Sequence, residues 1–175
     1  MKSVSIILPY FRKKKFINKT LKSIFNQTYN IYELLIVYDD ENKNELKNLI
    51  KITKNHKKIK ILVNKKNIGA GESRNRAIKV AKGEYIAFLD ADDIWKKDKL
   101  KKQMLFMVKN NYMFSYTSYK TFGLKHKFVV PPKKFNFLNF THNTSIGTST
   151  MMVKKKVIEN VGFSNTKICE DYYFK

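Results

Sequence analysis

The sequence predicts an α/β fold, in which a Rossmann-like, mostly parallel sheet is flanked by helices. Over the first 110 residues, short apolar segments alternate with amphipathic helical segments, which is the pattern of repeated βαβ units. The apolar segments are continuous runs, and such runs are typical of parallel strands that are buried on both faces. Polar residues follow three of these runs, so they would meet at one edge of the sheet, where open α/β sheets bind their ligands.

The elements of this first part follow one another at short intervals. The first expected strand covers residues 3–8, and Pro9 should stop it because proline has no N–H to donate to a sheet. Later strands are expected at residues 34–37, 59–63 and 85–89. Helices are expected at residues 13–27, after Asp40, at 71–82 and at 97–109, because apolar residues recur there three and four positions apart. Ile50 and Val108 belong to the apolar faces of the second and the fourth helix.

Shorter and more mixed elements are expected after about residue 110. Strands are expected at residues 112–119, 125–130 and 149–153, with an aromatic loop at 135–143 and a short helix at 154–160. Glu170 and Asp171 open one more helix, which ends with the chain after about one turn. We therefore expect a single domain over residues 1–175, whose part from about 111 to 175 is truncated at its C-terminus.

Composition excludes several classes of protein. Cys169 is the only cysteine, so the chain holds no internal disulfide and no cysteine-based zinc site, which fits a reducing cytoplasm. No apolar run approaches the roughly 18 residues of a membrane-spanning helix. The 36 Lys and Arg against 14 Asp and Glu give a net charge of +22, which attracts polyanions such as nucleic acid or anionic lipid. The lysines are scattered, so a lysine-rich coding bias is the favoured cause and attraction to a membrane surface a consequence.

A cluster of three acids at the end of the strand at 85–89 is the most informative local feature. Asp90, Asp92 and Asp93 lie within four positions, and carboxylates this close repel one another unless a cation relieves the repulsion. Ligands that are all oxygen suit a hard ion such as Mg²⁺ or Mn²⁺, which often shares its coordination with substrate phosphates. The alternative interpretation is an acidic turn that caps a helix.

Six segments in order resemble the family 2 glycosyltransferases of the nucleotide-sugar-binding GT-A type. They are VSIILPY at 4–10, IFNQTY at 24–29, IVYDD at 36–40, NIGAGESRN at 67–75, GEYIAFLDADDIW at 83–95 and EDY at 170–172. Each is weak alone, but six in this order are specific. The resemblance covers almost the whole chain and implies a GT-A fold. Residues from about 1 to 110 would be its nucleotide-sugar-binding half, and residues from about 111 to 175 its acceptor-side half.

The resemblance implies roles for both groups of acids. Asp90, Ala91 and Asp92 resemble the DXD element, in which Asp92 would bind the Mn²⁺ or Mg²⁺ that bridges the donor diphosphate. Asp90 would lie near the ribose or the sugar of the donor. Glu170 and Asp171 resemble the acid pair on the acceptor side. Asp171 would be the general base that takes the acceptor proton, and Glu170 is either the alternative base or a helix cap.

The resemblance also implies a pocket for the nucleotide. Asp39 matches the acid that reads the base, and a carboxylate there can accept the N–H of uracil. The register departs from the family pattern, so Asp39 and Asp40 could exchange roles. Arg74, which follows the loop that contains Gly69, can contact the base or the diphosphate, or else form a salt bridge on a helix face. Pro9 and Tyr10 follow the first strand and are also expected to bind the nucleotide-sugar, although an aromatic residue there often belongs to the core.

The implied function is an inverting, metal-dependent glycosyltransferase that moves a sugar from a nucleoside-diphosphate sugar, with UDP as the expected nucleotide. The acceptor is a hydroxyl of a glycan or glycolipid of the bacterial cell surface. We expect the protein in the cytoplasm, in peripheral contact with anionic lipid at the inner face of the plasma membrane, and with no nucleic acid as partner. The alternatives are a sugar nucleotidyltransferase, whose glycine-rich loop is missing after Pro9, and a basic nucleic-acid-binding module without catalysis, for which no familiar motif appears.

Overall fold

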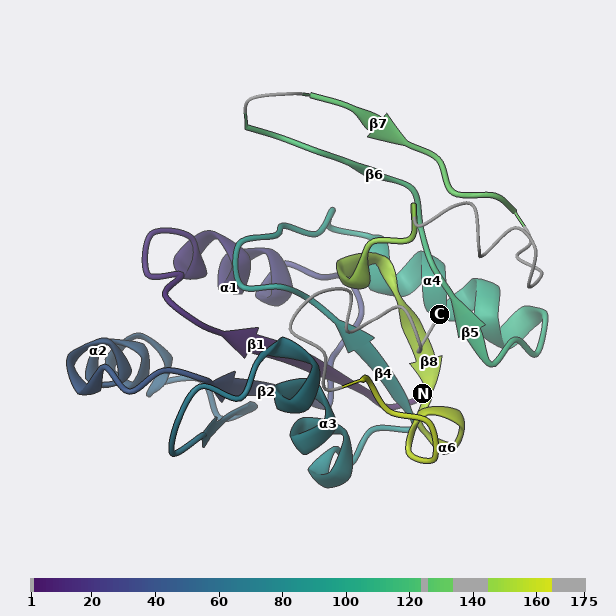
Figure 1. Cartoon of the computed structure of the whole chain (residues 1–175). Coiled ribbons are helices and arrows are strands. Elements are labelled where there is room, and N and C mark those ends of the chain that lie inside the picture. The colour runs from purple at the N-terminus through teal and green to yellow at the C-terminus, as the bar shows by residue number, and fades with distance from the viewer. Residues whose placement is uncertain (1, 124–125, 134–144, 165–175) are drawn as a thin grey trace.

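A six-stranded sheet forms the centre of the computed structural model, which describes residues 2–123, 126–133 and 145–164 (Figure 1). The strand order is β3-β2-β1-β4-β8-β5. The first four of these are parallel, and β8 is antiparallel to both of its neighbours, so the predicted mostly parallel sheet is confirmed. The bounds are β1 Val4–Tyr10, β2 Glu33–Tyr38, β3 Ile59–Val63, β4 Tyr85–Phe88, β5 Phe114–Ser115 and β8 Met152–Lys154.

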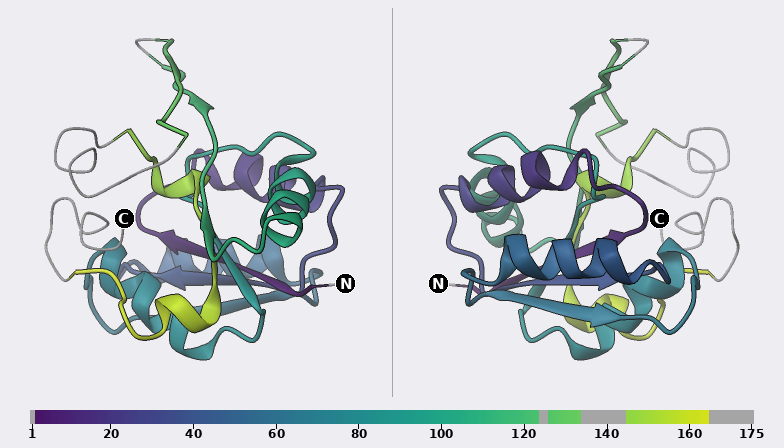
Figure 2. Two further views of the ribbon diagram at one scale, coloured as in Figure 1. Left: turned by 90° about the vertical axis from the view of Figure 1, so that its right-hand side faces the viewer. Right: turned by 90° about the vertical axis from the view of Figure 1, so that its left-hand side faces the viewer.

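Helices cover both faces of this sheet, as Figure 2 shows. Their bounds are α1 Ile17–Phe25, α2 Lys43–Thr53, α3 Ala70–Val80, α4 Lys99–Lys109 and α6 Lys155–Ile158. Buried side chains of α1, α2 and α4 pack on one face with Ile6 and Leu8, while those of α3 and α6 pack on the other with Ile7. Both faces are therefore buried, which explains the continuous apolar runs in the sequence. None of the helices in the described part of the chain is long and apolar enough to cross a membrane.

The first strand does not stop at Pro9, so that prediction is wrong. The carbonyl of Ile7 accepts from Leu89 at the end of β4, and the carbonyl of Tyr10 accepts from Asp39 at the end of β2. Backbone groups alternate sides along a strand, so the nitrogen of Pro9 faces the β4 side. Pairing with β4 has already ended at Ile7, and the missing N–H therefore costs no ladder hydrogen bond.

The second part differs from its prediction in several boundaries. The strand expected at 112–119 is divided into β5 and a separate strand β6 (Tyr119–Lys120), which pairs with β7 (Phe128–Val129) in a two-stranded antiparallel sheet. At 149–153 a 3₁₀ turn (Thr148–Thr150) precedes β8, because Thr150 bonds back to Gly147 through both its N–H and its hydroxyl. The expected helix at 154–160 is only α6. The aromatic loop predicted at 135–143 lies wholly outside the described residues.

Two apolar positions that were expected inside the helix faces are exposed instead. Ile50 on α2 and Val108 on α4 are half exposed, while their neighbours Leu49 and Met107 are fully buried. Adjacent apolar residues on a helix point about 100° apart, so only one of each pair can face the sheet.

A buried cluster lies at the N-terminal ends of β1 and β2, opposite the carboxyl ends of these strands. The carboxylate of Glu33 accepts hydrogen bonds from the Ser5 hydroxyl at 2.8 Å, the Lys82 N–H at 2.6 Å and the Lys60 ammonium at 2.8 Å. Gly83 lies against this cluster, and a Cβ there would come within 2.4 Å of the Ser5 nitrogen. The cluster thus fixes the register of β1, β2 and β4, and with it the positions of their carboxyl ends.

Candidate active site

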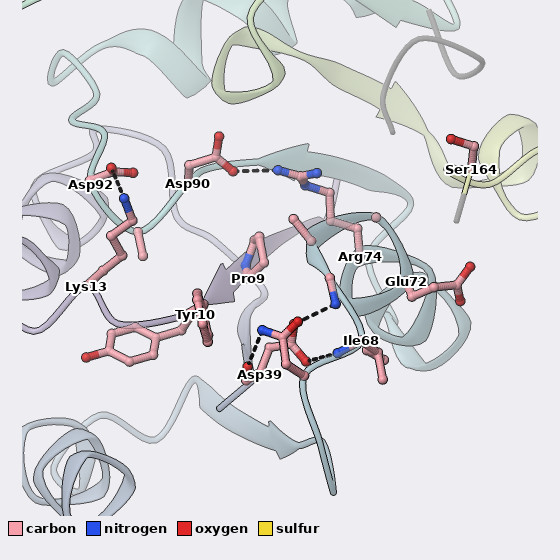
Figure 3. Close-up of a pocket in the computed structure, with 16 residues that line it drawn as sticks. Pro9, Tyr10, Lys13, Asp39, Ile68, Glu72, Arg74, Asp90, Asp92 and Ser164 are labelled. Carbon is pink, nitrogen blue, oxygen red and sulfur yellow. Dashed lines mark hydrogen bonds and ion pairs between the residues drawn. The ribbon is translucent and has the colours of Figure 1, made fainter. Parts of the chain in front are cut away.

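A cleft of about 690 Å³ opens at the carboxyl ends of β1, β2 and β4 (Figure 3). Every residue predicted to bind the nucleotide-sugar lines it, except Asp40. These residues are Pro9, Tyr10, Asp39, Gly69, Arg74, Asp90, Ala91 and Asp92. They come from the ends of three strands, the start of α3 and the loop before it, so the parallel sheet brings them to one place.

Asp39 is a buried and fully oriented carboxylate. Its Oδ1 accepts hydrogen bonds from the Asn64 amide at 2.7 Å and the Ile68 N–H at 2.8 Å, and its Oδ2 accepts from the Gly69 N–H at 2.9 Å. The side chain of Asn67 also bonds to the Asp39 carbonyl at 3.0 Å. Gly69 has φ = 89°, a conformation that glycine adopts without strain and that turns the loop into α3. Asp39 therefore ties the glycine loop to the end of β2.

Asp40 turns away from the cleft. Its Oδ1 accepts from the backbone N–H groups of Glu41 and Asn42 at 2.7 and 3.3 Å, and its Oδ2 lies 3.4 Å from Nε of Arg12. It therefore shapes the turn that leads to α2, where Asn42 is the N-cap. Between the two acids that the sequence left open, the geometry places Asp39 at the cleft.

Arg74 and Asp90 form an ion pair across the cleft. Nη2 of Arg74 donates to Oδ1 of Asp90 at 2.6 Å, and the Arg74 side chain is only 3% exposed. The guanidinium also lies over the ring of Phe163, 5.1 Å from its centre. A planar guanidinium held on two sides is a rigid group. The salt bridge expected as an alternative role for Arg74 thus exists, within the cleft and not on an outer helix face.

The loop that carries the acids is fixed by its neighbours. The carbonyl of Ala91 accepts from the Thr20 hydroxyl of α1 at 2.9 Å, and the Asp90 N–H donates to the Ser149 hydroxyl at 3.0 Å. The indole N–H of Trp95 donates to the Ser149 carbonyl at 2.8 Å. The 3₁₀ turn that replaces the expected strand therefore supports this loop.

Asp92 pairs with Lys13, a residue that was not among the predicted site residues. Nζ of Lys13 lies 2.6 Å from Oδ2 of Asp92, and both side chains are partly exposed in the cleft (Figure 3). No signal in the sequence distinguished Lys13, because it is one of three consecutive lysines in a lysine-rich chain. Its place in the loop directly after β1 is the one available hint.

The pKa of Asp93 reflects how closely the three acids lie together. Burial raises the pKa of its carboxyl, and the charges of Asp90 and Asp92 add to this, while Ser149 and Lys13 oppose it. Asp93 does not line the cleft, and α4 has Asp98 as its N-cap, so Asp93 does not cap that helix.

Tyr10 lines the cleft, but its ring belongs to the core. The ring is 1% exposed and stacks on Tyr38, with 5.6 Å between the ring centres. Its hydroxyl donates to Glu45 of α2 at 2.6 Å, and burial together with this bond raises its pKa far above the ordinary value. Figure 3 shows the hydroxyl directed away from Asp90, so the ring is not free to stack on a base.

The carboxylates of the cleft fit a divalent metal whose other ligands are substrate phosphates and water. Among the described residues, no group of three or more His, Cys, Asp and Glu side chains could hold a metal ion. Asp92 offers one carboxylate that is open to the cleft, and a cation, the Lys13 ammonium, already lies against it. This arrangement fits Mg²⁺ or Mn²⁺, which are bound through one or two carboxylates plus substrate phosphates and water. The predicted base residues, Glu170 and Asp171, lie outside the described residues.

Comparison with known proteins gives one family. The model of the family described as Glycosyl transferase family 2 matches residues 5–162. A curated relative from Escherichia coli, UDP-Glc:alpha-D-GlcNAc-diphosphoundecaprenol beta-1,3-glucosyltransferase WfgD, is 35% identical over 173 residues, which cover 97% of this chain and 67% of the relative.

Two solved structures share the fold. Residues 1–349 of TarS from S. aureus, in complex with UDP, superpose with a TM-score of 0.81 at 23% identity. The mannosyltransferase PcManGT from Pyrobaculum calidifontis, in complex with GDP-Man and Mn²⁺, gives a TM-score of 0.75 at 16% identity. The superposition with TarS covers 97% of this chain and 53% of TarS, and that with PcManGT covers 98% of this chain and 50% of PcManGT. This chain therefore spans about half the length of either structure. The predicted fold is thereby confirmed.

Proposed function

Because the chain belongs to glycosyl transferase family 2, as its motifs predict, we propose that it transfers a sugar from a UDP-linked donor to a hydroxyl of a lipid-linked glycan. One observation carries this proposal: Asp39, Arg74 and the pair Asp90 and Asp92, which come from three separate segments of the sequence, line a single cleft at the carboxyl ends of the strands. The relative WfgD is named for a UDP-Glc donor and a diphosphoundecaprenol-linked acceptor, which supports both substrate classes.

Asp39 would read the base. Among the described residues its Oδ2 accepts one hydrogen bond, from Gly69, so a second lone pair is available for the imide N–H of uracil. The other contacts hold the carboxylate in place before the nucleotide arrives, which lowers the cost of binding. The start of α3 faces the same cleft through Ala70 and Gly71, and its positive end favours an anionic ligand there.

Asp92 would hold the metal, and Asp90 would contact the ribose or the sugar. The ion, when bound, supplies a Lewis acid that neutralises charge on the departing diphosphate. Asp90 is restrained by Arg74, so its second oxygen can accept from a sugar hydroxyl in a fixed direction. Mn²⁺ and Mg²⁺ are both proposed, since both prefer oxygen ligands.

The chemical step would be a single displacement. The acceptor oxygen attacks the anomeric carbon, the bond from that carbon to the UDP oxygen breaks, and the acceptor proton passes to a carboxylate. One displacement inverts the anomeric configuration. We assign the proton to Asp171 and keep Glu170 as the alternative. Replacing Asp171 by Asn should lower transfer by about 10²–10⁴-fold, with donor affinity unchanged, because the base touches only the acceptor.

Contact with a membrane would bring the enzyme to a lipid-linked acceptor. We propose peripheral binding to the cytoplasmic face through anionic lipid, supported by the net charge of +22. The β6–β7 hairpin stands away from the rest of the structure (Figure 2) and exposes Phe122 at 56% and Phe128 at 70%. Aromatic side chains beside lysines such as Lys120 and Lys127 are suited to the interface of an anionic bilayer.

A comparison of donors tests the proposed function. Sugar transfer to a polyprenyl-diphosphate-linked GlcNAc acceptor is measured with UDP-, GDP- and dTDP-linked glucose. The proposal predicts transfer from the UDP-linked donor with an inverted product. Preference for GDP or dTDP would contradict UDP as the donor nucleotide, and retention of configuration would contradict the single displacement.

A further inference from the structure

The ammonium group of Lys13 lies against the carboxylate of Asp92, which is the group proposed to bind the metal. Its Nζ is 2.6 Å from Oδ2 of Asp92, although the two residues are 79 positions apart. The backbone of Lys13 is fixed, because its carbonyl accepts from the N–H groups of Phe16 and Ile17 at 2.9 and 3.1 Å. Any movement of the charge must therefore come from the four-carbon side chain.

Among the described residues, the ion pairs Arg74–Asp90 and Lys13–Asp92 of the cleft differ in how easily they can open. The Arg74 side chain is 3% exposed and is held by Asp90, whereas the side chains of Lys13 and Asp92 are 41% and 36% exposed. An ion pair between solvated side chains contributes little to stability, in general between about 0 and 1 kcal/mol. The pair of Lys13 and Asp92 is thus the one that a ligand can displace.

A metal on Asp92 and an ammonium on the same carboxylate oppose each other. If the ion takes Oδ2, Lys13 loses its acceptor, and if the ion takes Oδ1, two like charges lie a few ångströms apart. Among the acids of the described residues, Asp90 is paired with Arg74 through Oδ1, and Asp93 does not line the cleft. A metal on Asp92 would therefore release the Lys13 ammonium to water or to an anion that enters the cleft with the metal.

We propose that Lys13 is an internal cation that holds Asp92 until a metal binds, is displaced by the metal, and then binds the donor diphosphate. An ammonium group has three donors, and diphosphate oxygens would be the nearest free acceptors in the loaded cleft. This inference rests on the proposed function. It follows that Lys13 weakens the binding of metal alone and strengthens the binding of nucleotide in the presence of metal, so that the two ligands bind cooperatively.

Metal and nucleotide titrations of two matched variants test this. Lys13→Gln removes the charge in the cleft, and Lys14→Gln removes the same charge from the exposed neighbour, which does not line the cleft. Mn²⁺ binding without nucleotide is followed by electron paramagnetic resonance, and UDP binding at saturating Mn²⁺ by calorimetry. Lys13→Gln should bind Mn²⁺ alone roughly 3–10-fold more tightly and UDP roughly 3–10-fold more weakly than wild type. Lys14→Gln should match wild type in both titrations, and Lys13→Arg should keep the weak binding of Mn²⁺ alone.

The outcomes separate this inference from the proposed function. Wild-type protein that binds no UDP in the presence of Mn²⁺ contradicts the proposed function, and the inference with it. Wild-type protein that binds both, with Lys13→Gln indistinguishable from Lys14→Gln in either titration, overturns the inference alone. Far-UV circular dichroism and the melting temperature establish that each variant is folded.

Discussion

Nη2 of Arg74 lies 2.6 Å from Oδ1 of Asp90, so the first turns of α3 are tied to the end of β4 across the cleft. Arg74 is almost completely buried in this position, whereas Arg76, two positions further along the same helix, is exposed. One ion pair thus connects a group proposed to contact the nucleotide with a group proposed to contact the sugar.

Arg74→Ala should weaken UDP binding and also destabilise the fold. The change removes a hydrogen bond between charged groups and leaves Asp90 without this partner, which costs about 1.5–3 kcal/mol for bonds of this kind. Lys79→Ala is the control on α3, because Lys79 is an exposed cation that does not line the cleft. Urea denaturation and UDP calorimetry measure the two effects, and equal results for both variants would contradict the role given to Arg74.

Asp39→Ala should lower UDP affinity by about 1–3 kcal/mol, because it removes a charged acceptor for the base. Asp40→Ala is the control, since Asp40 is an equally acidic neighbour that faces away from the cleft. It should cost stability at the turn before α2 while UDP affinity stays near that of wild type. Calorimetry with both variants decides between them, and a larger loss of affinity for Asp40→Ala would transfer the base-reading role to Asp40.

Glu33 predicts an acid-sensitive contribution to stability. Burial alone would raise its pKa, but hydrogen bonds from Lys60, the Lys82 N–H and Ser5 outweigh burial and lower the pKa below its ordinary value of 4.5. A lowered pKa means that the folded state favours the carboxylate, so this stability is complete above about pH 4.5 and is lost as the pH falls through the folded-state pKa.

The variant Glu33→Gln tests this directly. It should be less stable than wild type at pH 7, and the difference in the free energy of unfolding should shrink when the pH is lowered below about 4.5. Urea denaturation at several pH values gives both quantities. A difference that stays constant from pH 7 to pH 3 would exclude the charge of Glu33 as its source.

Much of the first half was predictable because its signals are local. Continuous apolar runs identified β1 to β4, and β3 was predicted with the bounds that it has, residues 59–63. The end of β1 was not predictable, because whether Pro9 breaks a strand depends on which side its nitrogen faces and on where β4 stops. The sequence also could not decide between Asp39 and Asp40. Neighbouring residues point to opposite sides of a strand end, and the sequence does not show which of the two faces the cleft.

The second half depends more on contacts between distant segments. β8 lies between β4 and β5, and its start at Met152 is set by the 3₁₀ turn that holds the acid loop through Ser149. No sequence pattern near Ser149 indicates that it supports the loop of Asp90 to Asp93. Lys13 was missed for a related reason, because its partner Asp92 lies 79 positions away.

The hairpin predicts a measurable affinity for anionic membranes. Wild-type protein should co-sediment with liposomes that contain phosphatidylglycerol, less with pure phosphatidylcholine, and less again as salt rises and screens charges beyond about 8–10 Å. Replacing Phe122 and Phe128 by Ser should reduce this binding. Leu105→Ser on α4, which removes an apolar side chain that is 61% exposed, is the control. Absence of binding at low salt would leave lysine-rich coding bias as the explanation of the charge.

Asp92 is proposed to bind a metal that in turn binds the donor diphosphate, and thermal unfolding with UDP is the decisive experiment. UDP should raise the melting temperature of wild-type protein in Mn²⁺ or Mg²⁺ and have little effect in EDTA, because a ligand stabilises only the state that binds it. Asp92→Asn, which preserves the shape of the side chain, should unfold like wild type without ligand and lose the metal-dependent part of the shift. Equal stabilisation by UDP in Mn²⁺ and in EDTA, or a full shift in Asp92→Asn, would contradict the account.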